Sequence, residues 1–315
     1  MIIRWCSIDF FQIKDLGFLS SLLRFYVFFS RVIVAEFQSE DFTMSFKRIS
    51  ILIFLLFVLP GLIIWNHVGF YLDDIFYPDW KGEQVHRPLF IVGNARSGTT
   101  WLHRLIALDE ATFTTFRTWE IIFGVSVTWK ITIIYLYNLD QFFSSPLFRA
   151  MSYLEGCILG RMALHQVGLQ EVEEDEWLMM HVFLSQLVML FFPLGGIVLR
   201  PLVLFDKADL DTFPLEMRRQ IFIYYKQCVK RHLYARSLMQ PKVHASAQGE
   251  SNKDNVIFLS KNPPFTMRLD ELYETFPDCR VACLVRDPLQ SVPSMISYIA
   301  KVRVLRGMVQ HVELA

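Results

Sequence analysis

The feature that most constrains the fold is an apolar run that leads directly into a glycine-rich turn. Leu89 to Val92 is typical of a buried strand, and the next nine residues read Gly-Asn-Ala-Arg-Ser-Gly-Thr-Thr-Trp. The spacing of Gly93 and Gly98 lets backbone N–H groups converge on an anion, and a helix beginning near Thr99 directs its positive end at the same point. This order predicts an α/β fold of P-loop type, with three layers and a central parallel sheet.

The loop differs from that of the nucleotide triphosphatases. Their pattern places a lysine after the second glycine, where it reaches the terminal phosphates, and then a hydroxyl that holds magnesium. Here Thr99 occupies the lysine position, and the cation lies inside the loop at Arg96. We also find no convincing magnesium-binding aspartate after a strand. A P-loop kinase therefore stays only as an alternative.

The loop resembles the 5′-phosphosulfate loop of the PAPS-dependent sulfotransferases, with Ala95 in place of the family's proline. The resemblance implies that Arg96 contacts the sulfuryl and bridging oxygens. It implies a nucleotide site that includes Gly93, Ser97, Gly98, Thr99 and Thr100. Trp101 is expected either to stack on adenine or to pack in the core.

A second strand is expected over Arg280 to Val285, and it ends in Arg-Asp-Pro. Arg286 and Ser294 have the spacing of the family's 3′-phosphate motif, an arginine at a strand end and a serine eight residues later. A guanidinium can grip a phosphate through two hydrogen bonds, and Pro288 can begin the helix that carries the serine. The resemblance thus implies that PAPS, and its product PAP, bind between the two motifs.

A third strand is expected over Val256 to Lys261, followed by an amphipathic helix over Leu269 to Phe276. It resembles the Leu-Lys-Ser-Pro-x-His stretch of a broad, often bacterial or membrane-linked branch of the family, with Asn262 for Ser and Phe265 for His. Lys261 is expected to stabilise the charge that develops on the leaving phosphate. An ordinary surface lysine is the alternative.

An acidic run precedes Trp177, and its members are Glu171, Glu173, Glu174, Asp175 and Glu176. Close carboxylates raise one another's pKa values, and the apolar residues that follow can desolvate one of them, so Glu174 is a candidate general base. A solvated helix cap is the alternative. His165 is a second candidate base. The expected reaction is in-line sulfuryl transfer from PAPS to a hydroxyl or amine, with no metal.

The composition favours membrane contact, because 53% of residues are hydrophobic and the mean hydropathy is +0.33. Ile49 to Leu72 contains no charged residue and is long enough to cross a bilayer, although Pro60-Gly61 leaves open a kink or a re-entrant hairpin, and a buried core helix is a further alternative. Gly17 to Phe37, interrupted by Arg24 and Arg31, is expected to be an interfacial helix. Trp177 to Leu199 is expected to be a buried or membrane-resting helix.

Three regions are therefore predicted: a membrane anchor over 1–72, a linker over 73–88, and a sulfotransferase-like domain over 89–315. The chain ends about 21 residues after Ser294, so the domain is expected to be C-terminally incomplete, and a non-catalytic or truncated membrane protein is an alternative function. The anchor suggests a Golgi-type location in a eukaryote, or an inner membrane with a cytosolic domain in a bacterium.

The acceptor is expected to be a glycan, a lipid or a small molecule. A nucleic-acid partner is excluded, because the 31 basic and 31 acidic residues balance. The five cysteines show no metal-binding spacing and are expected to be buried small hydrophobes, with one disulfide possible.

Overall fold

The computed structural model of this chain describes residues 15–38, 46–158, 168–185, 215–239 and 256–305. Its sheet contains four strands in the described part: β1 (Leu89–Gly93), β2 (Phe113–Thr114), β3 (Ile257–Lys261) and β4 (Arg280–Leu284). Their order is β2-β3-β1-β4, and each pair is parallel. Because β1 pairs with a strand on both sides and is covered on both faces, its residues are almost all apolar. The predicted α/β fold with a central parallel sheet is confirmed.

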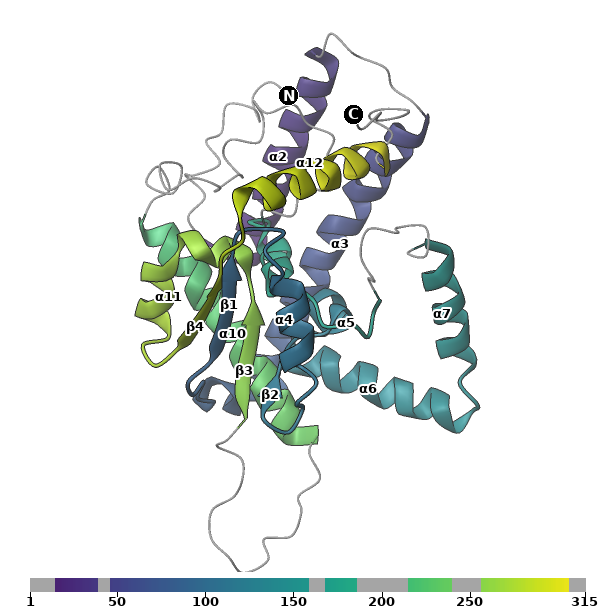
Figure 1. The fold of residues 1–315 in the computed structure, drawn as a ribbon. Helices are drawn as coiled ribbons and strands as arrows, with labels where there is room; N and C mark the ends of the chain where they lie inside the picture. Colours follow the sequence, from purple (N-terminus) through teal and green to yellow (C-terminus); the bar gives the residue numbers. More distant parts are fainter. Residues whose placement is uncertain (1–14, 39–45, 159–167, 186–214, 240–255, 306–315) are drawn as a thin grey trace, which may run out of the picture.

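Helices cover the two faces of the sheet. Figure 1 shows α4 (Thr99–Ile106) in front of the strands and α10 (Leu215–Met239) behind them. The 3-10 helix η6 (Pro263–Met267) and then α11 (Leu269–Thr275) connect β3 to β4, and α12 (Pro288–Leu305) follows β4. The predicted helices after Gly98, Lys261 and Pro288 are all present.

An aromatic cluster fills the space between the sheet and α10. Phe265 is fully buried there, with its ring centroid 4.9 Å from that of Phe222, 5.0 Å from that of Tyr225 and 6.2 Å from that of Phe90. The phenylalanine at this position therefore serves the core. The ring is thus packed among other aromatic side chains.

Two N-terminal helices belong to the same core. These are α2 (Phe18–Gln38) and α3 (Phe46–Phe76), and their buried side chains join one continuous cluster with those of the sheet and α10. Within α3, Leu52–Phe76 is long and apolar enough to cross a membrane, and 39% of its most apolar window is buried in the protein. Length and composition alone do not distinguish a span from a core helix.

The last turns of α3 are embedded in the folded domain. Asp73 is fully buried, lies 3.0 Å from the Arg231 Nε atom, and accepts hydrogen bonds from the N–H groups of Val127 and Thr128. The linker predicted over 73–88 is thus largely structured, since α3 continues to Phe76 and the 3-10 helix η2 (Pro78–Gly82) buries Trp80.

The arginine that seemed to interrupt α2 is also internal. Arg24 is fully buried, and its Nε donates to the carbonyl oxygen of Val182 at 2.9 Å. Val182 ends η3 (Asp175–Val182), a buried 3-10 helix. The expected helix over Trp177 to Leu199 therefore begins as a buried 3-10 turn, and its part beyond residue 185 lies outside the described residues.

Three further helices follow β2: α5 (Thr118–Phe123), α6 (Val127–Phe142) and α7 (Pro146–Ile158). The last two extend away from the sheet, to the right in Figure 1. Cys228 is buried, Cys279 is half-buried and Cys283 is exposed, and all three carry free thiols. The expectation of buried cysteines thus fails for Cys283, which lies near the exposed end of β4. The side chains of Cys6 and Cys157 lie outside the described part.

Candidate functional site

The parallel sheet brings the predicted motifs to one edge. Gly93 ends β1, Lys261 ends β3 and Leu284 ends β4, and β1 lies between the other two. In open parallel sheets ligands bind beyond the carboxyl ends of strands whose connections leave in opposite directions. The candidate site lies at such a point.

The loop after β1 has a backbone that requires glycine. Gly93 has a φ of 134°, and a Cβ atom there would lie 2.3 Å from the carbonyl oxygen of Leu284. Gly98 has a φ of 92° and directly precedes α4. Arg96 also has a positive φ, of 69°. The two glycines therefore allow the loop to turn tightly against β4 and to open onto the N-terminus of α4.

Three predicted anion-binding residues are in direct contact. The Nε of Arg96 donates to the Oγ of Ser294 at 3.0 Å, and Nη1 of Arg286 donates to the backbone oxygen of Arg96 at 3.1 Å. The remaining bonds of the Arg286 guanidinium go to the neutral amide of Gln290. Within the described residues no carboxylate pairs with Arg286. The Arg286 guanidinium thus contacts the backbone of the loop that carries Arg96, where β1 and β4 end, and two cationic residues at this place favour binding of a multiply charged anion.

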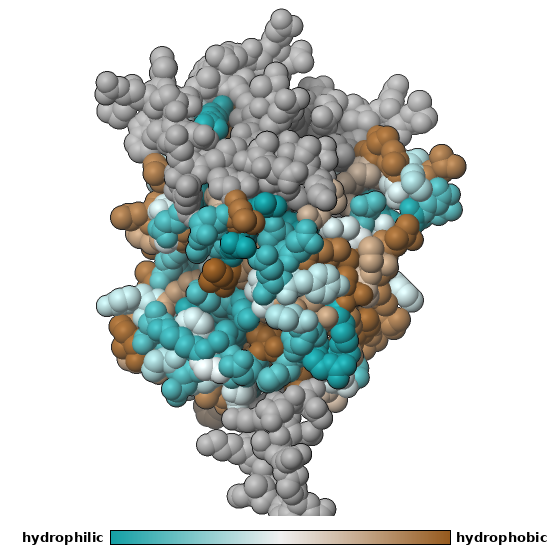
Figure 2. Space-filling model, turned by 90° about the vertical axis from the view of Figure 1, so that its left-hand side faces the viewer, coloured by the Kyte–Doolittle hydropathy of each residue, from teal (hydrophilic) through white to brown (hydrophobic). Residues whose placement is uncertain are grey.

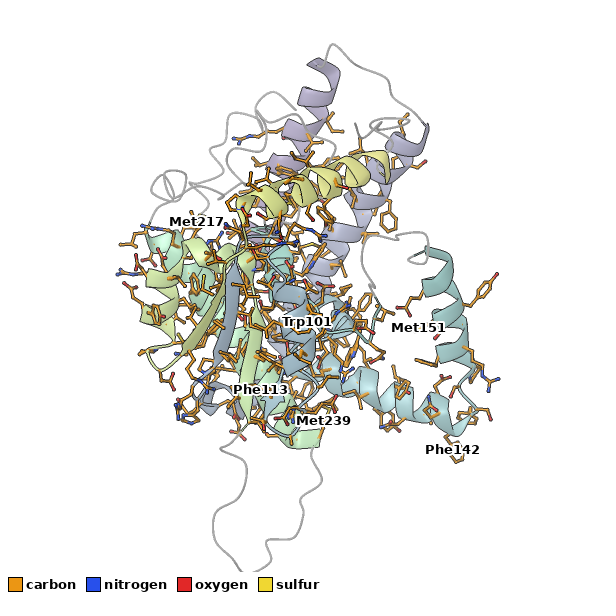
Figure 3. All side chains as sticks on the ribbon, viewed as in Figure 1. Trp101, Phe113, Phe142, Met151, Met217 and Met239 are labelled. Atoms are coloured by element: carbon orange, nitrogen blue, oxygen red, sulfur yellow. The ribbon has the colours of Figure 1, made fainter. Side chains whose placement is uncertain are left out.

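The loop hydroxyls differ in their surroundings. The Oγ of Ser97 is buried and has no hydrogen-bond partner among the described residues. Thr99, two residues later, is also buried. A buried hydroxyl without a partner costs free energy unless a ligand or water completes it. Trp101 is 70% exposed on α4, so it does not pack in the core (Figure 3). The exposed ring remains available for stacking.

Lys261 and Glu174 form an ion pair at the end of β3. The lysine side chain is only 2% exposed, whereas that of the glutamate is 22% exposed. The alternative of a surface lysine is therefore wrong. The pair brings together two residues that the sequence proposed separately, one as a stabiliser of the leaving group and one as a general base.

Comparison with known protein families finds a match in the C-terminal part of the chain. Residues 204–313, which include β3, β4, Lys261, Arg286 and Ser294, match the model of the sulfotransferase family. The C-terminal part of the chain is thus similar to the sulfotransferase family. No curated protein matches the sequence at a significant level.

Two solved structures share the fold of this chain. Sulfotransferase STF9 from Mycobacterium avium is similar with a TM-score of 0.54 and 18% identity, over 88% of this chain and 60% of that chain. Sulfotransferase STF1 from Mycobacterium tuberculosis H37Rv is similar with a TM-score of 0.52 and 19% identity, over 96% of this chain and 66% of that one. The chain thus spans less than two thirds of the length of each solved sulfotransferase.

The acidic run before Trp177 is divided between two environments. Asp175 is fully buried and accepts hydrogen bonds from the hydroxyl of Tyr225 and, at 3.0 Å, from the amide of Asn262. Burial raises the pKa of Asp175 to about 6, although these hydrogen bonds act to lower it. Burial, with a smaller contribution from the charge of Glu174, also raises the pKa of Glu173. Desolvation therefore raises the pKa values of both neighbours of Glu174. Asp175, which is buried and hydrogen-bonded, has a structural role.

His103 belongs to the site, although the sequence analysis missed it. It is buried on α4, its Nε2 lies 2.8 Å from the Oγ1 of Thr115, and burial together with the charges of Lys261 and Arg104 lowers its pKa to about 3. The signal available in the sequence is its place four residues after Thr99, on the same helix face. His165, the other candidate base, lies outside the described residues.

A separate cavity of about 170 Å³ lies at the β2 edge of the sheet. It is lined in part by an internal ion pair, in which Lys130 Nζ lies 3.0 Å from Glu120 and 2.7 Å from His232 Nδ1. None of the predicted site residues lines this cavity. In the part of the chain that the structure describes, no group of three or more metal-ligating side chains occurs.

Proposed function

We propose that this chain transfers a sulfuryl group from PAPS to a hydroxyl or amine. The observation that carries the proposal is the contact of Arg96, Arg286 and Ser294 at the ends of β1 and β4. These residues come from two motifs about 190 positions apart in the sequence, and they converge on one point with an excess of positive charge.

The donor is assigned to this point by the number and kind of groups present. The loop from Gly93 to Thr100 offers backbone N–H groups and hydroxyls to the 5′-phosphosulfate, and the Ser97 hydroxyl gains a partner there. Arg286 and Ser294 suit the 3′-phosphate. The hydrogen bond between Arg96 and Ser294 would give way to charge-assisted bonds with the donor, which are the stronger kind. Trp101 is exposed to stack on the base.

The transfer itself is assigned to the ion pair at β3. Glu174 accepts the proton of the acceptor hydroxyl or amine while the acceptor oxygen or nitrogen bonds to sulfur. The bond from sulfur to the bridging oxygen breaks, and Lys261 with Arg96 neutralises the charge that this oxygen retains. His103, which is uncharged at neutral pH, lies near Lys261 and contacts Thr115, the residue that follows β2. Positioning and electrostatics supply most of the acceleration in this scheme.

The location proposed for the enzyme is a membrane, held by the first part of α3, and the acceptor proposed is a glycan, lipid or small molecule. The exposed face of α3 includes Phe54 and Phe57, which are 61% and 70% exposed. If these residues lie in lipid, the chain should stay with membranes after washing with alkaline carbonate and be released by detergent. Release by carbonate alone would contradict this location.

A thermal-shift titration of the detergent-solubilised chain with PAP, in EDTA, tests the donor site. PAP at about 100 times its Kd should stabilise the chain by about 2.7 kcal/mol, seen as a rise in Tm. Arg286→Ala should abolish the rise, because it removes the guanidinium assigned to the 3′-phosphate. Arg219→Ala, on the exposed surface of α10, is the matched control and should keep the wild-type response. A response to ATP with magnesium and none to PAP would refute the proposal.

A further inference from the structure

The outer part of α6 and all of α7 form a hairpin that projects from the molecule and exposes apolar side chains. We call residues 131–156 the α6–α7 hairpin. Figure 1 shows it extending to the right, away from the sheet. Its large apolar residues that are at least 37% exposed are Tyr135, Leu136, Tyr137, Leu139, Phe142, Phe143, Leu147, Phe148, Met151 and Tyr153. So many exposed apolar side chains on one element are unusual for a surface that faces water, and they indicate an interaction site.

The base of the hairpin is firmly fixed to the protein. Ser126 caps the start of α6 by accepting a hydrogen bond from the N–H of Trp129, and the indole ring of Trp129 stacks on that of Trp65 with centroids 3.9 Å apart. Lys130 is 1% exposed and paired with Glu120. Buried contacts at the start of α6 therefore fix the direction in which the hairpin extends.

The α6–α7 hairpin contains few charged residues. Only Asp140, Arg149 and Glu155 are charged between residues 131 and 156. Asp140 is buried in the turn, where its two carboxylate oxygens accept hydrogen bonds from the N–H groups of Leu147 and Phe148, each at 2.9 Å. Glu155 accepts a hydrogen bond from the N–H of Leu169. The acids are thus used internally, and the exposed ion of the hairpin is the cation Arg149.

The shape of the apolar surface distinguishes a lipid from a protein partner. Residues 135–139 are five consecutive exposed positions, which take in more than one full turn of α6. A protein partner covers one face of a helix and leaves a polar face elsewhere. Four of these five residues are large and apolar, Asn138 being the exception, so apolar side chains point in most directions around this turn, as suits a surrounding apolar medium. Phe142 points outward from the end of the hairpin in Figure 3, and it is 81% exposed.

We infer that the α6–α7 hairpin inserts its turn into the interfacial region of an anionic phospholipid bilayer. Tyrosine suits this region because it combines an apolar ring with a hydroxyl that can reach the headgroups, and phenylalanine can enter the apolar boundary below them. Arg149 lies next to the apolar turn, where it can meet a lipid phosphate. The opposite side of the molecule, over α11 and β4, is mainly hydrophilic (Figure 2). The inference concerns this hairpin alone and does not depend on the sulfuryl-transfer reaction.

A spin-label experiment on the full chain tests the inference. Phe142→Cys and, separately, Leu147→Cys are labelled with a nitroxide in a Cys283→Ser background, and the chain without the new cysteine provides the blank. Nanodiscs of phosphatidylcholine and phosphatidylglycerol are added. Both labels should become several-fold more accessible to oxygen than to a water-soluble nickel chelate. Tyr273→Cys, on α11, is the control, and its label should stay accessible to the chelate.

Two outcomes would overturn the inference. Labels at both turn positions that remain accessible to the nickel chelate would place the hairpin in water. Labels shielded from oxygen and from the chelate alike would place it in a protein contact, such as one with a second copy of the chain. Two label positions on the same turn guard against a local effect of either substitution.

Discussion

At the scale of single residues, the contacts that define the site join distant parts of the sequence. Lys261 and Glu174 are 87 positions apart, and Arg96 and Ser294 are 198 apart. Each partner was recognisable as a chemical group from its local motif. Their pairing follows only from the register of the parallel sheet, because that register decides which strand ends meet.

The Lys261–Glu174 pair carries a prediction about catalysis. Glu174→Gln and Lys261→Met should each lower kcat by about 100-fold or more, because one removes the proposed base and the other removes the charge proposed to stabilise the leaving oxygen. PAP binding should change little. Initial rates of PAP release from PAPS at saturating acceptor, together with PAP titrations, measure both effects.

Lys226→Met is the matched control for the lysine substitution. Lys226 is also partly buried and donates to the backbone oxygen of Thr275, on the α11 side of the molecule. It should leave kcat near the wild-type value. Wild-type rates in Glu174→Gln and Lys261→Met would show that the ion pair is structural.

At the scale of elements, α3 shows how a hydropathy pattern and a fold can diverge. Its run of apolar residues suits a membrane span by length, yet its last turns hold Asn66 and Asp73 inside the domain. Asp73 accepts hydrogen bonds from two N–H groups at the start of α6 and pairs with Arg231 of α10, so three helices meet at one carboxylate. A full crossing by Leu52–Phe76 would require this buried ion pair to lie at one membrane boundary.

Asp73→Ala therefore should destabilise the fold strongly. Removal of one partner leaves the Arg231 charge buried and uncompensated and also removes two hydrogen bonds to the start of α6, so the loss in unfolding free energy is expected to be about 3–5 kcal/mol. Urea unfolding of the detergent-solubilised chain measures it. Asp79→Ala, at an exposed position of η2, should change the free energy by about 0.5 kcal/mol at most. Equal urea midpoints for the two variants would contradict the role of Asp73.

At the scale of the whole molecule, Asp175 connects η3 to α10 and to β3 through Tyr225 and Asn262. Its folded pKa of about 6 lies above the ordinary value of 3.8. The folded state therefore holds this proton more tightly than the unfolded chain does. The resulting stabilisation is fully present below about pH 4 and is lost as the pH rises through about 6.

Asp175→Asn should remove this pH dependence. Between pH 4 and pH 7 the unfolding free energy of the variant should rise relative to that of the wild type by about 3 kcal/mol, since each pKa unit corresponds to 1.36 kcal/mol. Urea unfolding of both proteins across this range provides the test. Parallel pH profiles would show that the Asp175 carboxyl does not titrate differently in the folded state.

The sequence by itself determined β1, β3 and β4, the glycine loop, the helix that follows it and the two arginine motifs, whereas the short strand β2 was not predicted. Each of these is set by a local pattern: apolar runs for buried strands, glycines for positive φ, and a proline to begin α12. Tertiary structure decided which polar residues are internal. Arg24, Asp73 and Lys130 are charged in sequence, yet they are buried, and each has at least one partner between 54 and 158 positions away. Such burial depends on long-range packing, which a local pattern does not record.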